Sequence, residues 1–82
     1  MLFMDIPYVV ENNRIARETV QRELTILDIS ETARNEAFAA IYNPKPRGVY
    51  FENNDLREAQ TLERALSKLG IPYRLAEVSE FA

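Results

Sequence analysis

The chain has 82 residues, a net charge of −3, and no cysteine, histidine or tryptophan. This length predicts a single α+β domain over residues 1–82, and the 46% hydrophobic content argues against disorder. The missing cysteine and histidine exclude disulfides, zinc–thiolate sites and the commonest general base, so the composition disfavours an enzyme. Such a small apolar domain can complete its core at a subunit interface, and a homodimer is kept as an alternative.

The first predicted element is a strand over residues 2–10, an apolar segment that contains Asp5 and Pro7. Its apolar run is far shorter than the roughly 20 residues needed to cross a bilayer, and it has no basic lead-in. We therefore expect a cytoplasmic protein without a membrane anchor.

Residues 14–29 allow two predictions. In a helix, Ala16, Val20 and Leu24 lie on one face because they are spaced by four residues. In a hairpin, Asn12-Asn13 forms the turn and residues 15–20 pair back on the first strand. In both cases residues 24–29 are expected to be extended.

A repeated pattern favours the helix. Glu11-Asn12-Asn13 precedes Arg17-Glu18, and Glu52-Asn53-Asn54 precedes Arg57-Glu58 half a chain later. Two strand–Glu-Asn-Asn–helix units indicate a duplicated β-α-β plan, which is that of a ferredoxin-like sandwich.

A second helix is predicted to begin at Asp28 or Ser30, since both residue types cap helices. Pro44 ends it, and residues 44–47 are expected to form a stiff turn. Its apolar face consists of Ala33, Ala37, Phe38 and Ile41.

The last third of the chain shows the clearest sequence pattern, which is that of a β-α-β unit. Residues 48–52 are predicted to form a strand, Asp55 with Glu58 to form a capping box, and Gly70 to end the helix in the left-handed conformation. A strand over residues 71–78 follows. The complete fold is expected to be a small ferredoxin-like sandwich, with a three- or four-stranded sheet covered by two or three helices. Its predicted core consists of Phe3, Ile6, Val9, Val20, Leu24, Phe38, Ile41, Val49, Phe51, Leu62, Leu66, Leu69, Leu75 and Val78.

Two segments resemble the RNA-recognition motif. Residues 2–6 resemble the short aromatic motif of its first strand, and residues 47–51 resemble the start of its octamer. Val49 and Asn54 depart from the pattern at expected aromatic positions, and the acidic balance disfavours a nucleic-acid backbone as partner. The resemblance implies a nucleic-acid surface made of Phe3, Arg47, Tyr50 and Phe51.

A protein-binding surface is the preferred alternative. Eight of the ten cations are arginine, which suits protein interfaces better than lysine does. Ile-Pro-Tyr occurs twice, and each tyrosine is expected near a sheet edge where a partner strand can add. The candidate interface residues are Tyr8, Arg57, Arg64, Tyr73 and Arg74.

Glu52, Asp55 and Glu58 offer oxygen ligands for a hard cation, but helix capping already accounts for the last two. No metal, cofactor or catalytic residue is predicted. By elimination, the expected function is a small non-enzymatic protein-binding module: a regulator, an adaptor or an inhibitor of the kind carried by mobile elements. The alternatives are a domain that binds RNA or single-stranded nucleic acid and a small-molecule-sensing regulatory domain.

Overall fold

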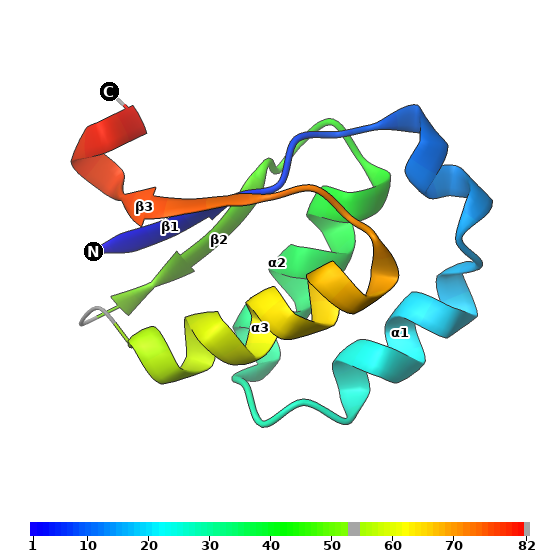
Figure 1. Ribbon diagram of the computed structural model, residues 1–82, viewed down its shortest axis with the longest axis horizontal. Helices are drawn as coiled ribbons and strands as arrows, with labels where there is room; N and C mark the ends of the chain where they lie inside the picture. The colour runs from blue at the N-terminus through cyan, green and yellow to red at the C-terminus, as the bar shows by residue number, and fades with distance from the viewer. Residues whose placement is uncertain (53–54, 82) are drawn as a thin grey trace.

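The computed structural model describes residues 1–52 and 55–81, and over these residues the chain folds as α+β with a three-stranded antiparallel sheet and three α-helices (Figure 1). The strands and helices are β1 (Leu2–Asp5), α1 (Arg17–Thr25), α2 (Glu31–Tyr42), β2 (Gly48–Phe51), α3 (Leu56–Leu69) and β3 (Arg74–Glu77). Two 3₁₀ turns, η1 (Val10–Arg14) and η3 (Val78–Phe81), complete this list. The predicted fold class is thereby confirmed at the level of α+β.

The sheet has the order β2-β1-β3, with β1 antiparallel to both neighbours. Phe3 lies opposite Tyr50 on one side and opposite Ala76 on the other. Since both edge strands run antiparallel to β1, they are parallel to each other, and α3 joins them around the central strand. The predicted strand–helix–strand unit is present, and its two strands are separated by β1.

The first and last strands are shorter than predicted. β1 ends at Asp5 instead of residue 10, because Pro7 cannot donate a hydrogen bond and the chain turns into η1. The N–H of Ile6 still donates to the carbonyl of Arg47 at 2.8 Å. β3 covers only Arg74–Glu77, and the N–H of Val78 bonds to Met1 as η3 begins.

Residues 17–25 form α1, so the hairpin alternative is wrong. The predicted extended segment over residues 24–29 is also wrong, because α1 continues to Thr25 and a turn follows. The guanidinium of Arg34 holds this turn. Its Nε donates to Leu24 O at 3.0 Å, and its Nη2 donates to the carbonyls of Leu27 and Ile29 at 3.1 and 3.3 Å.

The helix ends largely follow the sequence. Ser30, not Asp28, caps α2, and its hydroxyl accepts from Ala33 N at 3.1 Å. Asp55 caps α3 as predicted. The Glu58 side chain does not complete the predicted capping box. Its Oε1 instead accepts from the N–H of Ser30 at 2.9 Å and so connects the start of α3 to the start of α2.

Gly70 ends α3 with a φ of 74°, the left-handed conformation that was predicted. The two copies of the Glu-Asn-Asn pattern cannot be compared in structure over their full length. Its first copy lies in η1, and Asn53 and Asn54 of the second copy lie outside the described residues.

The core lies between the sheet and the helices. Eight of the fourteen predicted core residues are confirmed as buried, namely Ile6, Val20, Leu24, Ile41, Val49, Phe51, Leu62 and Leu66. Ala33 and Ala37, which were predicted on the apolar face of the second helix, are buried, and with Ala40 their short side chains let α2 pack closely on β2. Sequence reasoning missed Met4 and Ala40. The remaining missed core residues are Tyr42, Ala59, Ala65 and Ile71.

The other six predicted core residues are not fully buried, although Phe38, Leu69 and Leu75 pack against the core. Phe3 is wrong by one position, because Met4 is fully buried and Phe3 therefore points to the opposite face of the sheet. Val78 is 37% exposed, since β3 ends before it. Val9, Phe38, Leu69 and Leu75 are only half-buried.

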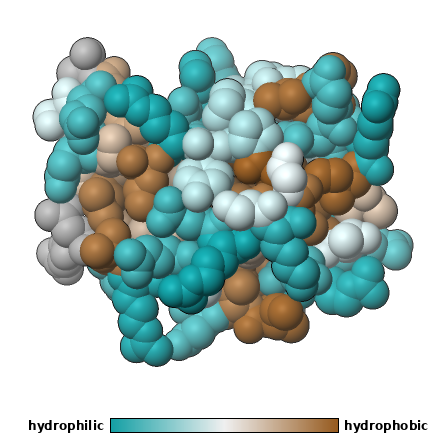
Figure 2. Space-filling view, viewed as in Figure 1, coloured by the Kyte–Doolittle hydropathy of each residue, from teal (hydrophilic) through white to brown (hydrophobic). Residues whose placement is uncertain are grey.

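The three helices lie on one side of the sheet, and among the described elements only η3 rises on the other side (Figure 1). Both chain ends lie at the same end of the molecule, where the N-terminal amine is 3.3 Å from Glu77 Oε2. Seen from the α3 side, hydrophilic residues cover much of the molecule and divide the hydrophobic residues into separate patches (Figure 2). None of the described helices has the length and apolar character needed to cross a bilayer.

We expect Arg34→Ala to lower the free energy of unfolding by about 1.5–3 kcal/mol, the usual range for hydrogen bonds to a charged group. The substitution leaves three carbonyls at the end of α1 and in the following turn without their donor. Urea unfolding measures the change. Arg64→Ala, at an exposed position of α3, is the control and should change stability little. A loss below about 0.5 kcal/mol for Arg34→Ala would show that the turn holds without this side chain.

Candidate interaction surface

The helix-free side of the sheet carries a cluster of aromatic and arginine side chains. We call it the aromatic face and define it by Phe3, Arg47, Tyr50, Arg74 and Phe81. Phe3 and Tyr50 are cross-strand partners, and their ring centroids lie 4.6 Å apart. Tyr50 is 53% exposed, which is unusual for a large aromatic residue on a strand.

Gly48 makes room for the ring of Phe3. A Cβ atom at this position would lie 2.8 Å from Cζ of Phe3 and would also meet the backbone carbonyl of Met4. The absence of a side chain at Gly48 therefore leaves room for the backbone of β1 and for the Phe3 ring, which lies beside Tyr50 at an interplanar angle of 42°. Gly48, which belongs to the segment that resembles the RNA-recognition motif, is thus needed for the packing of this face.

Two arginines flank the rings. Nε of Arg47 donates to Asp5 Oδ1 at 2.9 Å, and the Arg47 side chain is still 65% exposed. The guanidinium carbon of Arg74 lies 4.7 Å from the ring centroid of Phe81. Phe81 in turn stands edge-on to Phe3, with an interplanar angle of 88°. The face thus combines π surfaces with cations and one paired carboxylate.

Three of the four residues predicted as a nucleic-acid surface belong to this face: Phe3, Arg47 and Tyr50. Phe51 does not, because it alternates to the helix side and is only 2% exposed. The sequence missed Phe81, since no local pattern says that the chain turns back over the sheet after β3. Arg74 was expected in the protein-binding set and lies here instead.

The structure spreads the residues predicted as a protein interface over several surfaces. Arg74 lies on the aromatic face, whereas Tyr8 lies in the segment after β1, where its hydroxyl accepts from Asn13 Nδ2 at 3.0 Å. Arg57 starts α3 and pairs with Asp28 at 3.6 Å. Arg64 and Tyr73 line one hollow along α3.

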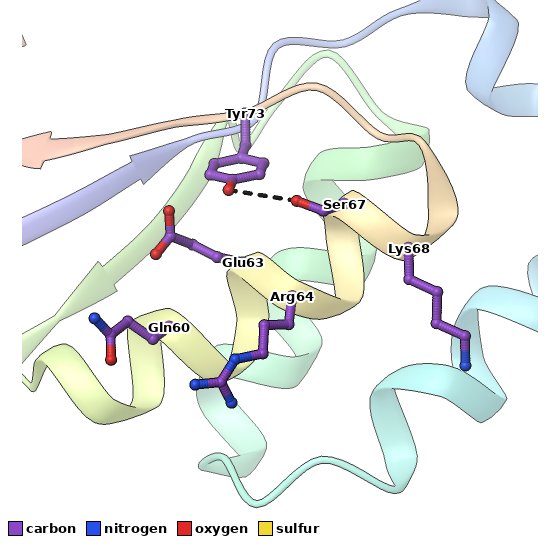
Figure 3. Close-up of a pocket in the computed structure, with 6 residues that line it drawn as sticks. All are labelled: Gln60, Glu63, Arg64, Ser67, Lys68 and Tyr73. Carbon is purple, nitrogen blue, oxygen red and sulfur yellow. Dashed lines mark hydrogen bonds between the residues drawn. The ribbon is translucent and has the colours of Figure 1, made fainter.

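That hollow has a volume of about 640 Å³ and is lined by Gln60, Glu63, Arg64, Ser67, Lys68 and Tyr73 (Figure 3). The hydroxyls of Tyr73 and Ser67 are 3.5 Å apart. Lys68 points away from Ser67 and toward α1, where its Nζ lies 3.2 Å from Glu23 Oε2 (Figure 3). The serine and the lysine therefore do not form a catalytic pair.

Two carboxylates at the start of α3 accept hydrogen bonds from backbone N–H groups at the starts of α2 and α3. Asp55 accepts from Glu58 N, and Glu58 accepts from Ser30 N. Over residues 1–52 and 55–81 no group of three acidic, histidine or cysteine side chains is placed to hold a metal ion. Asn53 and Asn54, which were considered with Glu52 as cation ligands, lie outside the described residues.

Two side chains of α2 have perturbed pKa values. Burial raises the pKa of the Glu36 carboxyl above its usual value. Burial also raises the pKa of Tyr42, partly opposed by the positive charge of Arg17, whose guanidinium carbon lies 4.9 Å from the ring centroid. The Tyr42 hydroxyl donates to Ile15 O at 2.7 Å, which gives this tyrosine a role in fixing the chain before α1.

We expect Gly48→Ala to lower the free energy of unfolding by about 1–3 kcal/mol, because the added methyl group overpacks the contact with Phe3 and Met4. Urea unfolding measures the loss, and near-ultraviolet circular dichroism reports the rearranged rings. Gly70→Ala is the matched control. It strains the helix end but meets no atom within 4 Å, so it should leave the aromatic signal unchanged. An unaltered aromatic spectrum in Gly48→Ala would contradict the packing role.

We expect Glu36→Gln to raise the melting temperature at pH 7 and to have little effect below pH 4. A carboxyl whose pKa is raised by folding adds stability below its unfolded pKa, near 4.5, and loses that contribution as the pH rises through the folded value. Glutamine removes the desolvation cost of this partly buried charge at neutral pH. Thermal melts of both proteins at the two pH values measure the difference. Equal melting temperatures at pH 7 would contradict this assignment.

Comparisons with protein-family models, with curated proteins and with solved structures find no match to this chain. We therefore infer the function from the geometry of this chain alone. Its distinctive feature is the aromatic face, in which side chains from β1, β2, β3 and η3 meet on a side of the sheet that no described helix covers.

Proposed function

We propose that the chain is a non-enzymatic protein-binding module that contacts its partner through the aromatic face. The observation that carries this proposal is Tyr50, half exposed beside Phe3 on the helix-free side of the sheet. Aromatic residues and arginine are enriched at protein interfaces and dominate their binding energy. The roles expected from the sequence (regulator, adaptor or inhibitor) all fit such a surface.

Charge supports a protein partner over a nucleic-acid backbone. The chain carries a net charge of −3, and one of the two arginines on the face is already paired with Asp5. Binding to phosphates gains affinity from each neutralised charge, and few cations are left here to supply it.

A second candidate is a domain that binds single-stranded nucleic acid. The observation that favours it is the contact between Phe3 and Tyr50 on adjacent strands, with Arg47 and Arg74 on the same side of the sheet. Bases stack on such aromatic platforms, and each stacked base contributes about 1–3 kcal/mol.

The remaining expectations stay predictions. A ferredoxin-like arrangement is compatible with the order β2-β1-β3 and is our interpretation of this sheet. We likewise propose that the protein is cytoplasmic. A small-molecule-sensing role has less support, because the hollow along α3 is lined mostly by polar and charged side chains, whereas small-molecule sites are usually concave and apolar.

The test compares Tyr50→Ala with Tyr8→Ala, since both tyrosines are exposed, at 53% and 38%, and only Tyr50 lies on the aromatic face. Each full-length chain is immobilised and exposed to nuclease-treated lysate of the source organism. We expect a stoichiometric protein that the wild type and Tyr8→Ala retain and that binds Tyr50→Ala at least about tenfold more weakly. Retention by Tyr50→Ala with loss in Tyr8→Ala would move the interface to the segment after β1.

Two further measurements on the same variants separate the alternatives. Fluorescence anisotropy with labelled oligo(dT) and oligo(U) tests the nucleic-acid candidate, which requires binding that weakens with salt and with Phe3→Ala. Light scattering over a dilution series tests the homodimer. A dimeric wild type and a monomeric Tyr50→Ala would identify a second copy of the chain as the partner.

A further inference from the structure

The ring of Phe81 is held between two side chains of the aromatic face. Its centroid lies 5.2 Å from that of Phe3 in an edge-to-face arrangement, and 4.7 Å from the guanidinium carbon of Arg74. Both geometries are favourable contacts for an aromatic ring. We call the place that the ring occupies the ring slot, with Phe3 and Arg74 as its walls.

The segment that delivers this ring is otherwise loosely attached. η3 is a single turn with no buried residue, and Val78, Ser79 and Glu80 are exposed. Among the described residues, the N–H of Val78 donates to Met1 O, and the Glu80 carboxylate accepts from the N–H of Glu77. Because the core lies on the other side of the sheet, Phe81 can leave the slot without exposing a core residue.

We propose that the ring slot is a binding site for an aromatic side chain of a protein partner, and that Phe81 occupies it until the partner arrives. This inference rests on the proposed function and names the chemistry that the aromatic face recognises. The chain itself supplies the model of the ligand: an aromatic ring that lies against the guanidinium of Arg74 and follows an acidic residue, Glu80, in the sequence.

The proposal has a quantitative consequence. A partner can use the slot only in the fraction of molecules in which Phe81 has left it, so its apparent affinity is lowered by that fraction. If Phe81 fills the slot in nine molecules of ten, its removal strengthens binding about tenfold. A residue that merely belonged to the interface would have the opposite effect, since its removal would weaken binding.

The first experiment uses the full-length Phe81→Ala variant and a peptide with the sequence of residues 78–82 as the probe. Addition of the peptide is followed by amide chemical shifts in ¹⁵N spectra. We expect saturable shifts at Phe3, Tyr50 and Arg74 in the variant, and binding to the wild type at least several-fold weaker. A control peptide with alanine in place of the phenylalanine should cause none of these shifts. Equal binding to both proteins, or no shifts in the folded variant, would overturn the proposal.

The second experiment uses the protein partner captured by the wild type. Phe81→Ala should bind it about tenfold more tightly, and Val78→Ala, in the same turn but outside the slot, should bind it as the wild type does. Weaker binding to Phe81→Ala would overturn the slot while leaving the aromatic face as the interface. Capture that is indifferent to Tyr50→Ala overturns the proposed function itself. Phe81→Leu, which keeps an apolar cover, should also bind more tightly and replaces Phe81→Ala if that variant does not fold.

Discussion

The sheet of this protein depends on a single four-residue strand. Among the strands that the structure describes, β1 alone is paired on both sides, and β2 and β3 are not hydrogen-bonded to each other. Its alternation sorts the molecule into two faces: Met4 points into the core, and Phe3 points away from the helices. Because side chains on a strand alternate strictly, one register decides both what the core contains and what the opposite face displays.

On the helix side, small residues allow close packing. The alanines of α2 bring its backbone near β2, and larger side chains of α1 and α3 fill the remaining volume. Polar groups at the helix ends then connect the elements. Glu58 links the starts of α2 and α3, and Arg34 binds the carbonyls that follow α1. These contacts explain how a chain of this size holds three helices without a disulfide or a metal in its described part.

On the other side the same strands present rings and cations. Gly48 has no side chain that would meet the Phe3 ring, so Phe3 can lie beside Tyr50. η3 then places the Phe81 ring against Phe3. The face therefore arises from residues that are far apart in the sequence. Because the helices stabilise the sheet from the opposite side, the exposed rings are free to serve recognition, which is the basis of the proposed binding role.

The sequence by itself determined α2 and α3, because caps such as Asp55 and Gly70 act through contacts a few residues away. It left α1 as one of two alternatives and predicted an extended segment over residues 24–29, where the structure has the end of α1 and a turn. The resemblance to the RNA-recognition motif grouped Phe3, Arg47 and Tyr50 with Phe51, and strand alternation turns Phe51 to the helix side instead. Only the tertiary structure decided that Met4 replaces Phe3 in the core, that Asp5 pairs with Arg47, and that Phe81 closes over the sheet. These outcomes depend on register and on contacts between distant segments, and no spacing within the sequence encodes them.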